Sequence, residues 1–303
     1  MIGRRLGRTV AMLAVAALAA ALSTGTAGAV SSNTLYYGGD STAVVTSKAR
    51  VYLVFWGSQW GTSSVDGNGN LRFSNDAVGA SGVVQQLLKS VGGSSDSWSG
   101  ALTEYCSGVA RGAASCPASG VPHIPAPSGG GALAGVWYDN AAPSPSAATE
   151  PQIGQEAVKA AAHFGNTTAT ANQAAQYVIF SPKGTNPDLY QSGGFCSWHD
   201  VNGDLGVSSF YGSIALTNLP YVADTSSCTS GFSSVLDAFT MIVGHEYAEV
   251  LTDRNPGGGW TATSGAEVAD ECAWNQPASK ITMGTGSYEL PNLWSNAANS
   301  CVP

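Results

Sequence analysis

The apolar and polar positions predict a chain in which strands and helices alternate. Strands are predicted where β-branched and aromatic residues gather, at residues 49–56, 136–138, 176–181 and 209–217. Helices are predicted from about residue 76 to 90, over 150–164, over 233–252 and, as a short element, over 267–272. This order favours an α/β or α+β domain.

The predicted helix over residues 233–252 has two unlike sides. Its apolar residues recur at steps of three and four, which is the helical period: Leu236, Phe239, Val243, Tyr247 and Val250. At 100° per residue these lie in one arc, and the opposite side carries His245 and Glu249, one turn apart, with Glu246 at its margin. One side therefore packs, and the other is available for chemistry.

Residues 1–29 have the pattern of a secretory signal peptide. Three arginines precede the apolar run over residues 10–22, and Ala27-Gly28-Ala29 has the small-residue form of a cleavage site. The apolar run is too short for a transmembrane span. We expect a secreted, extracellular protein whose mature chain, residues 30–303, forms a single domain, with a possible internal boundary in the Pro/Ser-rich residues 141–148.

The charge of the mature chain excludes some partners. Removal of the signal leaves nine basic against 20 acidic side chains, a formal charge of −11. That balance argues against nucleic acid or an anionic membrane as a partner.

Six cysteines in an oxidising compartment predict three disulfides. The sequence does not determine their connectivity. We favour the sequential pairs, in which one bond pins the Gly/Ser/Pro-rich residues 94–128: Cys106–Cys116, Cys196–Cys228 and Cys272–Cys301.

The polar side of the helix over 233–252 suggests a metal site. Only 11% of the chain is charged, yet His245, Glu246 and Glu249 fall within five residues, and such groups are costly to bury without partners. In an HExxH motif two imidazoles bind one zinc ion while the Glu acts as general base. Here Glu249 replaces the second imidazole, and a carboxylate also suits manganese or calcium. His199 could restore a nitrogen ligand.

Residues 244–249, followed by 265–272, resemble the gluzincin metallopeptidases. The resemblance implies a zincin-like fold, with a mixed sheet packed against the motif helix, that hydrolyses peptide or protein substrates with a divalent metal ion, zinc first. It also implies the roles of five residues: His245 and Glu249 as ligands, Glu267 as third ligand, Glu246 as general base, and Asp270 orienting a ligand. The departure is Glu249 in place of histidine.

A second resemblance extends over more of the chain. The opening 31–39, the strand 51–57, the Cys-Ser-Trp-His loop at 196–199, the GHEYAE helix and the tail 267–272 are similar to the extracellular EXORDIUM or phosphate-induced protein family. This family has a GHExxE helix followed by a Glu-x-Ala-Asp-x-Cys tail. The resemblance implies a secreted protein associated with the cell wall, and a non-catalytic function is then the alternative. Bridged Cys196 and Cys272 would be consistent with it.

Several interpretations stay open at the level of sequence. His199 is either a ligand, a transition-state donor or part of a structural hydrogen bond. The acidic cluster is either a site or a set of ordinary helix-surface charges with a core histidine. Eight Trp and eleven Tyr in a secreted chain also suggest a glycan-binding module. No role is assigned to His123 or His163.

Overall fold

The computed structural model describes residues 33–273 and 279–303, so the predicted signal peptide lies outside the described residues. Its centre is a five-stranded sheet in the order β5-β2-β6-β8-β7, in which β7 is antiparallel to β8 and the other pairs are parallel. The strands are β2 Arg50–Trp56, β5 Leu133–Asp139, β6 Ala175–Phe180, β7 Trp198–Val201 and β8 Ala215–Leu219. The protein is therefore a mixed α/β domain.

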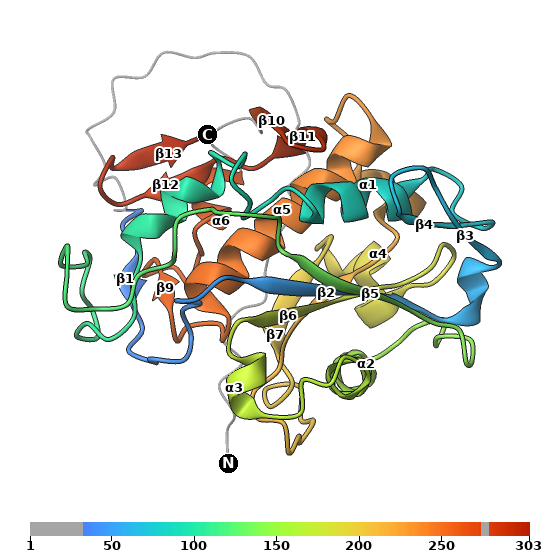
Figure 1. Ribbon diagram of the computed structural model, residues 1–303, viewed down its shortest axis with the longest axis horizontal. Coiled ribbons are helices and arrows are strands. Elements are labelled where there is room, and N and C mark those ends of the chain that lie inside the picture. Colours follow the sequence, from blue (N-terminus) through green and yellow to red (C-terminus); the bar gives the residue numbers. More distant parts are fainter. Residues whose placement is uncertain (1–32, 274–278) are drawn as a thin grey trace, which may run out of the picture.

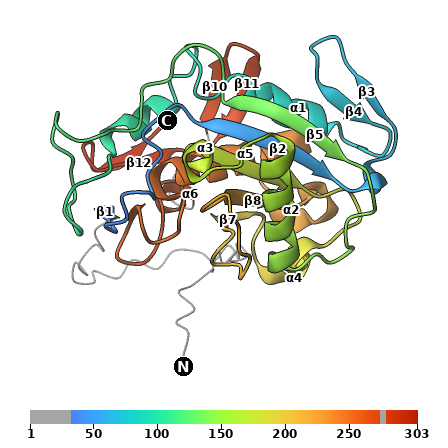
Figure 2. The same ribbon diagram turned by 60° about the horizontal axis from the view of Figure 1, so that its bottom comes forward.

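Helices cover both faces of this sheet (Figure 1). Along β2, Val51, Leu53 and Phe55 face a core that α5 (Val235–Asp253) and α1 (Ala80–Leu88) complete. The alternate residues of β2 face a second core with α2 (Glu150–His163). Figure 2, turned so that α2 comes forward, shows the sheet between α2 and α5. Both faces of the sheet are buried, which explains why its strands are almost continuously apolar.

The helices begin at side chains that accept hydrogen bonds from free backbone N–H groups. Thr149 and Gln152 form a capping box at the start of α2, and the Ser234 hydroxyl accepts from the Leu236 N–H at 3.0 Å at the start of α5. The Asp76 carboxylate accepts from the first backbone N–H groups of α1. The Ser234 cap sets the residue at which α5, the helix that carries the motif, begins.

Smaller elements surround the sheet. The described part of the chain forms four two-stranded sheets: β1 Tyr36–Tyr37 with β9 Trp260–Thr261, β3 Ser63–Val65 with β4 Leu71–Phe73, β10 Ser279–Met283 with β11 Gly286–Leu290, and β12 Leu293–Ser295 with β13 Ser300–Val302. Short helices are α3 Ala169–Asn172, α4 Tyr190–Gly193 and α6 Asp270–Ala273, with 3-10 turns at Ser58–Trp60, Ser99–Glu104, Pro187–Leu189, Val222–Asp224 and Ser226–Cys228. The β10–β11 and β12–β13 hairpins lie on the α5 side of the sheet (Figure 1).

Three disulfides join the sequential cysteine pairs Cys106–Cys116, Cys196–Cys228 and Cys272–Cys301. They are consistent with an oxidising, extracellular compartment. Within residues 33–273 and 279–303, every helix is too short or too polar to span a lipid bilayer. Residues 141–148 link β5 to α2, and a domain boundary there stays a prediction.

Two predicted elements differ from the structure. The loop expected around Trp198, His199 and Asp200 is the antiparallel edge strand β7, because it pairs with β8 over residues 215–218. The strand expected over 209–217 begins only at Ala215. Before it lies a loop in which Gly212 has φ +87°, a conformation that ends a strand, and Phe210 is exposed. The first difference arises from pairing between separate segments, which local residue preference does not encode. The second arises from the loop conformation at Gly212.

A buried carboxyl on α2 makes stability depend on pH. Glu156 is 5% exposed, and burial, with Asp139 nearby and only partial compensation from Lys159, raises its pKa to about 8 from an ordinary 4.5. Between these two pH values the folded state holds a proton that the unfolded state has lost, so stability falls as pH rises. We expect the free energy of unfolding of Glu156→Gln to rise by about 3 kcal/mol relative to that of the natural protein as the pH is raised from 5 to 8. Urea unfolding at several pH values measures this difference. If the free energies of unfolding of the two proteins depend on pH in the same way, the prediction is wrong.

Candidate metal centre

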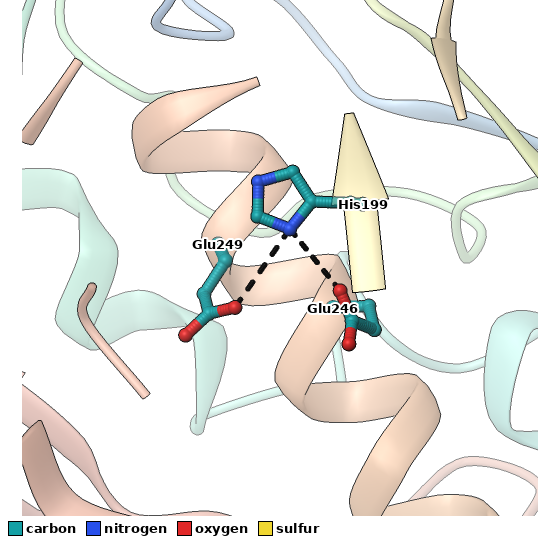
Figure 3. Close-up of side chains that lie close together, drawn as sticks. All are labelled: His199, Glu246 and Glu249. Carbon is teal, nitrogen blue, oxygen red and sulfur yellow. Dashed lines mark hydrogen bonds and ion pairs between the residues drawn. The ribbon is translucent and has the colours of Figure 1, made fainter. Parts of the chain in front are cut away.

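Helix α5 brings two glutamates into a buried position beneath the edge strand β7. Glu246 and Glu249 are each 3% exposed, and His199 of β7, 6% exposed, faces them. Its Nδ1 atom lies 3.1 Å from Glu246 Oε2 and 3.8 Å from Glu249 Oε2. Figure 3 shows this ring nitrogen directed between the two carboxylates. We call His199, Glu246 and Glu249 the inner group.

A second cluster shares Glu249 and is nearer to solvent. The Nε2 atom of His245 lies 3.0 Å from Glu249 Oε1 and 3.3 Å from Asp270 Oδ1. The side chains of His245 and Asp270 are 14% and 23% exposed, and the backbone N–H of Asp270 donates to Glu249 Oε1 at 3.2 Å. We call His245, Glu249 and Asp270 the outer group. In each group the three ligand atoms lie close enough together to hold a metal ion.

Hydrogen bonds outside these groups orient the side chains. The Ser197 hydroxyl donates to Glu246 Oε1. His199 Nε2 lies 3.0 Å from the backbone carbonyl of Asp253, at the end of α5. The Asp253 carboxylate accepts from the backbone N–H groups of Gly257 and Gly259, each at 2.6 Å. Asp253 therefore contacts His199 through its backbone carbonyl and holds the turn after α5 through its carboxylate.

Glu267 adds a carboxylate on the far side of His199. Its Oε1 atom lies 3.5 Å from His199 Nε2, with which it forms an ion pair when the imidazole is protonated. Among the described residues this buried atom accepts no hydrogen bond. A buried carboxylate oxygen in this state is costly unless a cation or proton compensates it. The donors of the inner group, one imidazole nitrogen and carboxylate oxygens, are those that zinc or manganese accepts. The buried His/Glu triad could therefore bind a metal ion.

The charges around the centre shift its pKa values strongly. Burial opposes protonation of both histidines, but Glu267 and Glu246 raise the pKa of His199, and Glu249 and Asp270 raise that of His245. Burial raises the pKa of Glu249 and of Glu267. Without a metal ion, protons compensate part of the buried negative charge, and a divalent cation would replace them.

The residues singled out in the sequence lie close together. Glu249 contacts His245, as their spacing of four predicts. Asp270, expected to orient a ligand, contacts His245 directly, whereas Glu267 contacts His199. The two remaining residues, Glu246 and His199, contact each other.

Two residues that support the centre were not predicted. Ser197 is adjacent to Trp198 in the Cys-Ser-Trp-His segment, and Asp253 follows the motif by one helical turn. In the sequence, only proximity to the motif could have indicated either residue. The contact of Ser197 with Glu246 depends on the position of β7, and that of Asp253 with Gly259 depends on the turn after α5.

Comparisons of the chain with models of protein families, with curated proteins and with solved structures find no match. What the centre does must therefore be inferred from its own geometry.

Proposed function

We propose that the protein is a secreted, metal-dependent peptidase of zincin-like type whose catalytic cation binds at the outer group. The observation that carries this proposal is the position of Glu249. Its carboxylate faces two imidazoles, that of His199 in the buried inner group and that of His245 in the partly exposed outer group. A catalytic cation needs one coordination position open to substrate. His245 and Asp270 are partly exposed, so the outer group meets this requirement better than the inner group.

Asp270 replaces Glu267 as the proposed third ligand at this position. Its Oδ1 atom and Glu249 Oε1 both face His245 Nε2, at 3.3 Å and 3.0 Å. Glu267 instead contacts His199. With one nitrogen and two carboxylate ligands, zinc and manganese are the metal ions to test first.

Glu246 is the proposed proton acceptor. The Ser197 hydroxyl and His199 Nδ1 contact its two oxygens and orient the carboxylate. A divalent cation at the outer group would polarise the scissile carbonyl and lower the pKa of the attacking water. Glu246 would take up the proton from that water and pass it to the leaving amine, with His199 stabilising the charge on Glu246.

The alternative is a non-catalytic extracellular protein related to the EXORDIUM family. The observation that favours it is the burial of the inner group, whose three residues are 3–6% exposed. A closed site of this kind suits a structural cation. Both proposals place the protein outside the cell, in keeping with its three disulfides.

Metal analysis combined with a proteolysis assay separates the two proposals. We expect the purified mature protein to bind zinc or manganese and to cleave unfolded casein. Glu246→Gln should lower kcat/KM by about 10²–10⁴-fold, the usual contribution of a general base, while the affinity for the catalytic cation is retained. Bound metal with no cleavage by either protein would exclude the peptidase and favour a structural cation. Absence of both metal and cleavage would leave the cluster as a polar network.

A further inference from the structure

The two oxygens of Glu249 serve different neighbours. Oε2 faces His199 in the inner group and Oε1 faces His245 in the outer group. A carboxylate can bind one cation through each oxygen, as it does in two-metal sites where the ions lie about 3.5–4 Å apart. The arrangement of Glu249 is that of a bridging ligand.

The spacing of the ligand atoms suits a cation in each group. Two ligands bound tetrahedrally to one zinc ion lie roughly 3.3–3.6 Å apart, given bond lengths of about 2.0–2.2 Å. In the inner group, His199 Nδ1 lies 3.1 Å from Glu246 Oε2 and 3.8 Å from Glu249 Oε2. In the outer group, His245 Nε2 lies 3.0 Å from Glu249 Oε1 and 3.3 Å from Asp270 Oδ1. Small side-chain shifts would therefore complete either site.

The balance of charge leaves room for two divalent cations. Four carboxylates surround the two histidines: Glu246, Glu249, Glu267 and Asp270. Among residues 33–273 and 279–303, the Lys and Arg ion pairs involve other acids. Metal binding requires ionised carboxylates and neutral imidazoles. In that state one divalent cation leaves two of the four negative charges, and a second cation balances them; the nearby Asp253 carboxylate is held separately by the backbone N–H groups of Gly257 and Gly259.

Glu267 adds negative charge beside the inner position. Its Oε1 atom is buried and lies 3.5 Å from His199 Nε2, on the opposite edge of the imidazole from the Nδ1 atom that faces the inner group. Glu267 is therefore not a ligand of the inner cation, but its charge favours a cation nearby.

We propose that the inner group is a second cation site, and that a cation bound there inhibits the reaction at the outer group. The inner cation would bind His199 Nδ1 and Glu246 Oε2. It would therefore occupy the carboxylate that accepts the proton in the proposed reaction and the imidazole that stabilises the charge on that carboxylate. The outer cation alone leaves Glu246 free to accept a proton. The inhibitory role rests on the proposed peptidase function, whereas the second site itself does not.

Zinc titration of the mature protein tests both parts. Equilibrium dialysis with metal analysis should give one Zn²⁺ per chain at low free zinc and two at high free zinc. Casein cleavage should rise with the first ion and fall at least tenfold with the second. Loading with Mn²⁺ should give an exchange-coupled electron paramagnetic resonance signal, because one carboxylate bridges the two ions.

Variants identify the two positions. Asp270→Asn changes a partly exposed ligand of the outer group. It should leave one cation, at the inner group, and no coupled signal. Glu271→Gln is the matched control in the same helix, since its side chain belongs to neither group; it should retain two cations and the natural activity. Circular dichroism checks that each variant is folded.

The outcomes keep the two proposals apart. If the chain binds one cation at saturating zinc and still cleaves casein, the proposed second site is wrong and the proposed peptidase function is supported. Two cations with undiminished cleavage overturn the inhibitory role. Two cations with no cleavage at any zinc concentration exclude the peptidase, and the inhibitory role with it, while the bridged pair of sites is supported.

Discussion

Replacing Glu249 with glutamine is expected to abolish cation binding at both groups and to reduce casein cleavage by about 10³-fold or more. Glu249 is the residue that the inner and outer groups share. Glutamine keeps the size of the side chain but supplies one neutral oxygen, and its amide N–H₂ would face one of the two imidazoles. Metal analysis after dialysis against Zn²⁺, followed by kcat/KM on casein, measures both effects.

The control for this variant is Glu271→Gln, which removes the same charge from α6 without touching either group. It should bind metal as the natural protein does. Equal metal content in Glu249→Gln and the natural protein would show that Glu249 is not a ligand. The thermal unfolding of both variants, measured with the metal removed, distinguishes lost ligation from lost folding.

Replacing Gly259 with alanine is expected to destabilise the fold by about 3 kcal/mol, the upper part of the range for overpacking. A Cβ atom at this position would lie 2.1 Å from the Thr252 carbonyl oxygen and 2.7 Å from Asp253 Cα. Both are backbone atoms at the end of α5, which cannot rotate away. The Gly259 N–H also donates to Asp253 Oδ1, so moving the turn would break that bond. Urea unfolding measures the change.

Two glycines are matched controls for this variant. A Cβ atom at Gly67 would meet no atom of residues 33–273 or 279–303 within 4 Å, so Gly67→Ala should change stability by less than about 0.5 kcal/mol. The same holds for space at Gly257, but its φ of +84° should make Gly257→Ala cost about 1 kcal/mol. If the three variants have the same free energy of unfolding, close packing is not the reason for glycine at position 259.

Local patterns were sufficient to predict the main elements of the fold. The strand over residues 49–56 corresponds to β2 and that over 176–181 to β6, because strands buried on both faces are continuously apolar. The helix over 150–164 corresponds to α2. The edge strand β7 was not predicted, since the pairing of Trp198–Val201 with β8 is a contact between separate segments.

The sequence by itself determined that one turn of α5 carries His245 and Glu249 on the same side, since helix geometry places residues four apart together. It also indicated a buried site, because three ionisable groups fall within five residues of a charge-poor chain. Only the tertiary structure decided that His199 faces Glu246 and that Asp270 faces His245. Those contacts depend on how β7 and α6 pack against α5, and sequence spacing carries no information about distances between separate elements.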